Sequence, residues 1–459
     1  MNRTTFKSSL LIAATIAVLT GCGDRLNVLP TQTIDEQNAL NTSNDVAVTL
    51  IGAYDGVQSG DVLGGAFQYI PDLLGDNAEV RFGGTFGSHQ EIWNKTIAKN
   101  NTQVAATWIV SYNAINRVNN VLSAIDKVDA ASKARIEGEA RFLRGFVYFE
   151  LVKLYAKAWG NGDNATNPGV PLVLTPTRVV DASSNVKRNS VAEVYTQVID
   201  DLTKAESLLP ASNGYYATKS AAAAVLSRVY LMQLNYAGAR DAANRVIMAN
   251  RYKLTDTYKE NFNTFLNYGG ADPSETIFSI QVNQQDGGSS LNTFYGVTIG
   301  SVPGTAGRGD VRIQTKHTSS YEAGDDRGTF FTRVGSNVYS LKFVDRYGNV
   351  PLIRLAEMYL TRAEANFRLT TTTGAAPLAD INLIRARALL PPLTTLTLDI
   401  AAILKERKLE LMFEGHLLPD LKRTRRSVGS LAWSADALVL PIPQREIDAN
   451  PNLTQNPGY

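Results

Sequence analysis

The chain has 459 residues, of which 44% are hydrophobic and 8% aromatic, enough to bury a large core. Its 45 basic and 43 acidic residues give a formal net charge of +2, which excludes the broadly basic surface typical of nucleic-acid-binding proteins. The single cysteine, Cys22, excludes an internal disulfide, so stability must come from packing.

The N-terminus has the order of a bacterial secretory signal peptide. Arg3 and Lys7 form a basic head, residues 10–19 are an uncharged apolar run, and small residues precede Cys22. The run of 10 residues is too short to span a bilayer, which takes about 20. A cysteine after small residues is the bacterial lipoprotein form, in which the thiol is acylated and becomes the new N-terminus. We therefore expect residues 1–21 to be a signal peptide and Cys22 to be lipidated, on a membrane surface outside the cytoplasm.

A polar tether over residues 22–42 follows, and helix-period patterns then dominate the chain. Helices are predicted over residues 105–128, 135–159, 190–209, 219–234, 236–250, 351–369, 378–390 and 399–415. The second is the strongest, because Leu143, Val147, Leu151 and Leu154 recur at three- and four-residue steps. An apolar face of this width predicts burial against several neighbouring helices.

Local signals mark the ends of some elements. Ser190 and Glu193 have the spacing of a capping box, so we expect a helix to begin there. Strand-like signals are few and cover residues 276–282, 338–344 and 438–442. Long loops rich in Gly, Asn and Ser are predicted at residues 59–104, 160–189 and 267–340. Loops of such length in a compact domain are usually functional.

Pairs of predicted helices indicate a degenerate repeat. Leu226, Tyr230 and Ala239 fall at the tetratricopeptide spacing, and Leu355 with Tyr359 matches its first half. Small residues at such positions let helices pack closely, and the tyrosines fill the groove between pairs. We therefore predict a mainly α fold, a tetratricopeptide-like α-α superhelix with long loops and a few short strands.

Several stretches, in order along the chain, resemble the SusD/RagB family of outer-membrane lipoproteins. The matching stretches are residues 139–155 (EARFLRGFVYFELVKLY), 355–365 (LAEMYLTRAEA), 382–387 (NLIRAR), 420–423 (DLKR) and 441–459. On this resemblance, residues 43–260 form a SusD-like N-terminal part with tetratricopeptide-like helices. Residues 261–459 form a RagB/SusD C-terminal part, packed with the first as one body.

The resemblance also implies a function. Such a protein lies on the outer face of the outer membrane and binds nutrient, usually oligosaccharide, through a long-looped, ligand-facing subdomain. It delivers the nutrient to a SusC-type TonB-dependent transporter, of which it forms the lid. A second function stays open, that of a tetratricopeptide-type scaffold binding protein or peptide at the cell surface.

Enzymatic chemistry is not predicted. The three histidines are widely separated, and no zinc-protease, nucleophile-elbow or phosphate-loop motif is present. Glu406, Glu410 and Glu414 share one side of a predicted helix, and paired carboxylates can hydrolyse glycosides. The adjacent Arg407 and Arg423 favour ion pairs instead. We therefore expect no catalytic residue, no cofactor and no metal-ligand set.

A sugar site needs aromatic faces for the ring and polar side chains for the hydroxyl groups. Residues 64–94 hold that mixture, and the resemblance to the SusD/RagB family implies a second contribution from the mid-chain loop. The candidate ligand-binding residues are Asn77, Arg81, Phe82, Phe86, Trp93, Asn292, Phe294 and Tyr295. A position in the core is the alternative for each aromatic residue.

Overall fold

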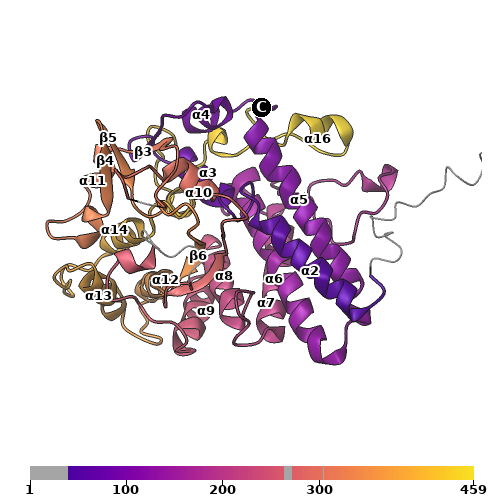
Figure 1. Ribbon diagram of the computed structural model, residues 1–459, viewed down its shortest axis with the longest axis horizontal. Helices are drawn as coiled ribbons and strands as arrows, with labels where there is room; N and C mark the ends of the chain where they lie inside the picture. Colours follow the sequence, from indigo (N-terminus) through magenta and orange to yellow (C-terminus); the bar gives the residue numbers. More distant parts are fainter. Residues whose placement is uncertain (1–39, 263–270, 303) are drawn as a thin grey trace, which may run out of the picture.

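The computed structural model describes residues 40–262, 271–302 and 304–459. The predicted signal peptide, Cys22 and nearly all of the predicted tether therefore lie outside the described residues. Figure 1 shows long helices lying side by side in one half of the molecule and short strands with loops in the other. The mainly α, tetratricopeptide-like prediction is confirmed, because consecutive helices stack on one another along the chain.

The helical half is a series of elements that each pack on the preceding one. They are α2 (Ser43–Gln58), α5 (Thr102–Ser123), α6 (Ala130–Tyr155), α7 (Val191–Leu208), α8 (Lys219–Met232), α9 (Tyr236–Met248) and α12 (Leu355–Leu369). Two further helices, α13 (Pro377–Arg387) and α14 (Ile400–Leu411), pack on α12. One apolar cluster contains buried side chains from Val46 to Leu453, so both halves contribute to one core.

Contacts between α6 and α7 illustrate how the sequence specifies the stack. The capping box is present, since the Ser190 hydroxyl accepts from the Glu193 amide at 3.2 Å and the Glu193 carboxylate accepts from the Ser190 amide at 2.7 Å. Gly145 on α6 has no side chain where Leu202 approaches; a Cβ there would lie 3.0 Å from the Leu202 Cγ. The Arg144 guanidinium pairs with the buried Asp201 carboxylate at 2.8 Å and joins the two helices.

Two small sheets lie in the other half. The four-stranded sheet has the order β1 (Val80–Phe82), β3 (Val311–Ile313), β5 (Asn337–Ser340) and β4 (Phe331–Val334), all antiparallel. The second sheet pairs β2 (Thr276–Ile280) with β6 (Val350–Arg354). The described residues also form short helices: α3 (Ala66–Leu74), α4 (Gly87–Asn94), α10 (Ser290–Tyr295), α11 (Thr315–Thr318), α15 (Leu417–Arg423) and α16 (Gln444–Ala449). Of these, α16 lies away from the four-stranded sheet, beside the upper end of α5 (Figure 1).

The expected loops are more ordered than the sequence predicted. Residues 59–104 contain α3, β1 and α4, and the described part of residues 267–340 contains both strands and short helices. The prediction of a strand over residues 438–442 is wrong, because no strand forms there. Residues 351–354, which were predicted to be helical, belong to strand β6. The reason is that these elements are short and set by distant partners: β1 pairs with β3 more than 200 residues later.

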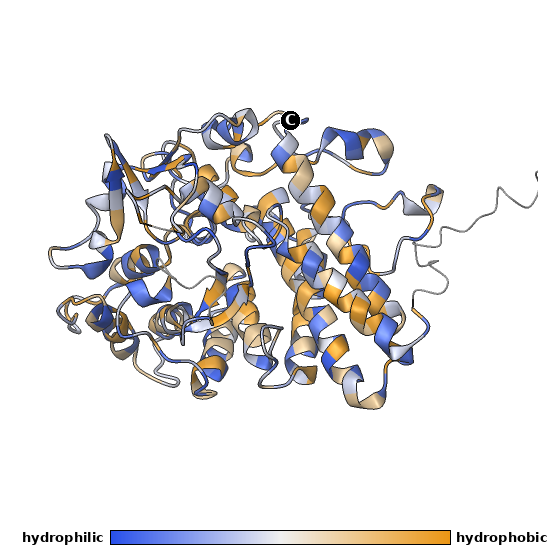
Figure 2. Ribbon diagram, viewed as in Figure 1, coloured by the Kyte–Doolittle hydropathy of each residue, from blue (hydrophilic) through white to orange (hydrophobic). Residues whose placement is uncertain are grey.

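Hydropathy follows the stacking. Figure 2 shows both apolar and polar residues along the long outer helices α2 and α5. The central helix α6 differs, because each of its residues from Phe142 to Val152 is buried, as expected for a helix packed on several neighbours. Within residues 40–262, 271–302 and 304–459, no helix is both long enough and apolar enough to span a bilayer.

Candidate functional site

The paired strands β1 and β3 present an arginine-rich surface. Their register buries one face of the ribbon through two pairs of apolar residues, Val80 with Ile313 and Phe82 with Val311. The alternation of a strand places the intervening pair, Arg81 and Arg312, on the outer face, where Arg81 is exposed and Arg312 half-buried. We call Arg81, Phe86, Arg308, Asp310 and Arg312 the arginine ribbon.

Two glycines make room for the charged side chains of the arginine ribbon. A Cβ on Gly83 would lie 2.4 Å from the Arg312 Cζ, and a Cβ on Gly84 would lie 2.4 Å from the Asp310 Cγ. The Gly83 amide also donates to the Asp310 carbonyl at 2.7 Å, which continues the ladder past the end of β1. The glycine pair therefore allows both side chains to lie flat on the backbone.

Phe86 is the exposed aromatic ring of the ribbon, with 42% of its surface accessible. The Arg308 guanidinium lies 4.5 Å from the centre of the Phe86 ring, within the range of a cation–π contact. Arg308 also donates to the Asp310 carboxylate at 2.8 Å and to the Thr85 hydroxyl at 3.0 Å. The surface thus combines an aromatic ring with several hydrogen-bond donors, which is the combination that sugar rings need.

An aromatic cluster beneath the surface holds Phe86 in place. The His89 ring lies at its centre, 5.5 Å from Phe86, 4.5 Å from Phe294 and 5.6 Å from Phe82. Burial lowers the pKa of His89 to about 4, so this ring is neutral at pH 7. The structure therefore brings together Phe82, Phe86 and Phe294, from two distant segments. Phe82 and Phe294 are buried in the cluster, and only Phe86 among the three has an exposed face.

Trp93 and Asn77 form hydrogen bonds that hold the start of strand β1 in place. The Trp93 indole donates to the Val80 carbonyl at 2.8 Å, and the Asn77 amide donates to the Trp93 carbonyl at 3.1 Å. Lys95 donates to the Asn77 side-chain oxygen and to the Trp93 carbonyl. Trp93 is half-buried, so part of its ring is accessible, whereas the amide of Asn77 is engaged on both sides.

Asn292 and Tyr295 have contacts within the core. The Asn292 amide donates to the carbonyls of Ala306 and Phe343, at 3.0 and 2.8 Å, and so holds the mid-chain loop. The Tyr295 hydroxyl donates to the Asp72 carboxylate at 2.6 Å. Burial raises the pKa of Asp72 to about 7, although the Tyr295 hydrogen bond opposes this shift. Both candidate residues are buried and so support the site from below.

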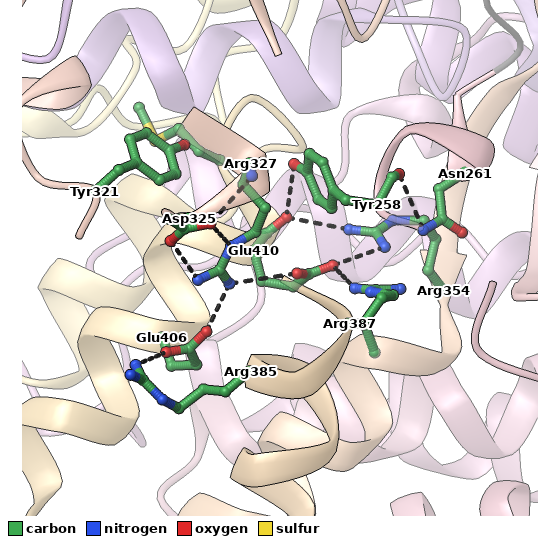
Figure 3. Close-up of polar contacts among 12 residues, drawn as sticks. Tyr258, Asn261, Tyr321, Asp325, Arg327, Arg354, Arg385, Arg387, Glu406 and Glu410 are labelled. Carbon is green, nitrogen blue, oxygen red and sulfur yellow. Dashed lines mark hydrogen bonds and ion pairs between the residues drawn. The ribbon is translucent and has the colours of Figure 1, made fainter. Parts of the chain in front are cut away.

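A buried ion network fastens this half of the molecule to the helices. Figure 3 shows its centre, and its charged members are Glu275, Asp325, Arg327, Lys342, Arg354, Arg385, Arg387, Glu406, Glu410 and Glu414. Arg327, in the 3₁₀ turn η4 (Asp326–Thr329), pairs with Asp325 at 2.8 Å and with Glu406 at 2.6 Å. Since η4 precedes β4 directly and Glu406 lies on α14, these bonds fix the sheet relative to the helices.

Arg354, the last residue of β6, is the most connected cation of the buried ion network. Its guanidinium pairs with Glu275 at 2.6 Å, Glu410 at 3.1 Å and Glu414 at 2.8 Å, and Arg387 bonds both Glu275 and Glu410. Burial raises the pKa of Glu414, but the attraction of Arg354 and Lys342 outweighs it and leaves this pKa below its usual range. Glu406, Glu410 and Glu414 are ion-pair partners, as expected, but not of the adjacent Arg407 and Arg423: those two arginines pair with Asp420, and Arg423 also with Glu364. The cations come instead from distant segments, which the sequence spacing could not indicate.

Sequence reasoning missed Arg308 and Arg312. They lie in the long loop predicted over residues 267–340, where Arg308, Asp310 and Arg312 recur at steps of two. That period places three charged side chains on one side of an extended strand. The pattern was a usable signal, although the pairing with Arg81 could not be known before the register of the strands.

The fold and this surface define a class: a helical-repeat body that carries a charged, partly aromatic surface on inserted short elements. The sequence profile of a family described as starch-binding and associating with the outer membrane matches residues 26–231, and that of the SusD family matches residues 311–436. The chain belongs to the SusD/RagB family.

Individual relatives agree along nearly the whole chain. A SusD-like protein of Formosa agariphila is 25% identical over 98% of both chains. The starch-binding protein SusD of Bacteroides thetaiotaomicron is 24% identical over 75% of this chain and 76% of its own. A crystal structure of a putative sugar-binding protein from Bacteroides vulgatus is 27% identical, covers 92% of this chain and 99% of its own, and superposes with a TM-score of 0.78.

Proposed function

We propose that this protein binds glycan at the arginine ribbon and its neighbouring aromatic residues. The single observation that carries the proposal is the exposed Phe86 ring, buttressed by a buried aromatic cluster and flanked by guanidinium groups. Stacking of a ring on an aromatic face contributes about 1–3 kcal/mol in the analogous case of nucleic-acid bases. The family description and the starch-binding relative support a glycan as the ligand class.

Binding without cleavage is the second part of the proposal. The three carboxylates that could have formed a hydrolytic pair are buried, and each is held by arginine or lysine. A glycosidase needs one carboxylic acid that can donate a proton to the substrate. Carboxylates that are buried and bonded to arginine or lysine are not placed to donate a proton to a bound glycan.

The third part concerns location and partner. We infer that Cys22 is lipidated after removal of residues 1–21, and that the protein faces the cell exterior as the lid of a SusC-type TonB-dependent transporter. In this proposal residues 22–42 are the tether, and residues 43–260 and 261–459 move as one body. The shared apolar core and the contacts between α9 and α12 support a single body.

Glycan binding can be tested on a soluble form comprising residues 23–459, screened against a panel of neutral and charged oligosaccharides by isothermal titration calorimetry. We expect binding without release of smaller sugars, and an affinity about 5- to 100-fold weaker for Phe86→Ala, as loss of about 1–3 kcal/mol implies. Tyr215→Ala is the matched control, because Tyr215 is 62% exposed and lies far along the chain from the ribbon. An unchanged affinity in Phe86→Ala contradicts the site, and binding of peptides alone favours the scaffold function.

A further inference from the structure

The register of β1 and β3 sets two like charges directly opposite each other. Arg81 and Arg312 are Cα partners in the antiparallel pair, and both lie on the outer face. Like charges at opposite positions destabilise a sheet. With Arg308 the surface has three positive charges against one negative charge, that of Asp310, so its net charge is +2.

The two opposed guanidinium groups have unused donors. Arg312 donates from Nη2 to the Gly83 carbonyl at 3.2 Å, and no hydrogen bond joins its Nη1 to any described residue; its Nε also has no partner but is buried against Gly83, so it is not offered to a ligand. No side-chain hydrogen bond or ion pair joins the Arg81 guanidinium to any residue in the described ranges. An arginine carries five N–H donors in a planar fork, a geometry that matches the oxygens of carboxylate and sulfate groups.

Arg308 differs from this pair. Its charge is already balanced by Asp310 at 2.8 Å, and its position over Phe86 fixes it beside the aromatic ring. The aromatic platform and the unbalanced pair therefore lie at different points of one ribbon. Gly83, which Arg312 covers, precedes Phe86 by three residues, so the two backbone positions are at most about 11 Å apart. One oligosaccharide can therefore reach both, with a ring on Phe86 and a charged group at the arginine pair.

We propose that the glycan bound here is anionic, with a carboxylate or sulfate group held between Arg81 and Arg312 and a sugar ring on Phe86. This inference rests on the proposed function and narrows its substrate class to glycans containing uronic acids or sulfate esters. The anion removes the repulsion between the two arginines on binding. A charge-assisted, bidentate contact also gives selectivity over neutral sugars that a hydroxyl cannot provide.

A second basic surface offers a matched control. A groove of about 860 Å³ beside α14 is lined by Arg368, Lys405, Lys408 and Arg426, with no acidic residue among its lining. An anionic glycan attracted only by general charge would bind there as well. Arg426→Gln removes one positive charge from this groove, just as Arg81→Gln removes one from the ribbon, and both residues are exposed.

The test compares three matched oligosaccharides by calorimetry: a neutral glucan, an oligouronate and a sulfated glycan of similar length. We expect the soluble protein to bind at least one anionic glycan about tenfold or more tightly than the neutral one. Arg81→Gln and Arg312→Gln should each remove most of that preference, whereas Arg426→Gln should leave the preference intact. Which anionic glycan binds distinguishes carboxylate from sulfate recognition.

Folding of the variants is monitored at the same time by thermal unfolding without ligand. Arg81→Gln should unfold at a temperature equal to or slightly above that of the wild type, because it removes a like-charge pair. Equal affinity for neutral and anionic glycans, or loss of the preference only in Arg426→Gln, overturns the inference while the proposed function stands. Absence of binding to any glycan defeats the proposed function itself.

Discussion

Replacement of Arg354 by methionine tests whether the buried ion network holds the two halves of the molecule together. Methionine keeps much of the apolar stem and removes the charge. In the wild type the guanidinium makes five hydrogen bonds, to the side chains of Glu275, Glu410 and Glu414 and to the Glu410 carbonyl, and the residue is 1% exposed. The variant leaves three buried carboxylates with fewer partners.

The expected loss of unfolding free energy in Arg354→Met depends on which ion pairs the three carboxylates keep in the variant. Five hydrogen bonds to charged groups at about 1.5–3 kcal/mol each would overstate the loss, because such energies do not add within a network. Arg387 still bonds Glu275 and Glu410, and Lys342 still pairs with Glu414 at 2.6 Å. Breaking a buried ion pair by removing one partner costs about 3–5 kcal/mol, and we expect a loss of unfolding free energy in that range.

Urea unfolding followed by circular dichroism measures this loss at pH 7. A decrease of about 3–5 kcal/mol corresponds to a fall of about 1 M or more in the urea midpoint. At pH 4.5 the gap between variant and wild type should narrow, because an orphaned carboxylate can take up a proton. Arg333→Met is the control, since Arg333 is exposed on β4, and its effect should stay within about 0.5 kcal/mol. A change below about 1 kcal/mol in Arg354→Met would refute the reasoning.

Three further predictions each concern a single residue. The pKa of Asp72 is raised from 3.8 to about 7, so its stabilising, protonated state is fully populated below about pH 4 and lost as pH rises to 7. In urea unfolding, the free energy of unfolding of Asp72→Asn should therefore equal that of the wild type at pH 4 and exceed it by up to about 4 kcal/mol at pH 8. A variant as stable as the wild type at both pH values would contradict this prediction. Gly83→Ala should displace the Arg312 guanidinium and weaken the glycan affinity several-fold in calorimetry. The free energy of unfolding, measured by thermal unfolding, should fall by no more than about 1 kcal/mol. An unchanged glycan affinity would contradict this prediction. Cys22→Ser should abolish incorporation of labelled fatty acid and release the protein from the membrane fraction, and continued labelling would disprove lipidation there.

Long helices could be predicted from the sequence because their signal is local. The apolar period of residues 135–159 and the capping box at Ser190 are both realised, in α6 and α7. The short strands could not be predicted in this way. A strand of three residues such as β1 has no period to detect, and its existence depends on β3.

The candidate site could be predicted only in part, because some of its residues come together through contacts between distant segments. Phe86 and Arg81 lie on the surface in the predicted segment, and Phe294 meets Phe86 across more than 200 residues. Composition cannot separate a ring that faces solvent from one that fills the core, so Phe82 and Tyr295 were indistinguishable from Phe86 in the sequence. The opposition of Arg81 and Arg312 exists only once the strands pair.

The most direct measurement of the central claim is a crystal structure of the soluble protein with its tightest-binding glycan. We predict a sugar ring stacked on the exposed face of Phe86, with a polar or charged substituent of the glycan within hydrogen-bond distance of Arg81 or Arg312. A glycan ordered at another surface, such as the basic groove beside α14, with the arginine ribbon unoccupied, would contradict it.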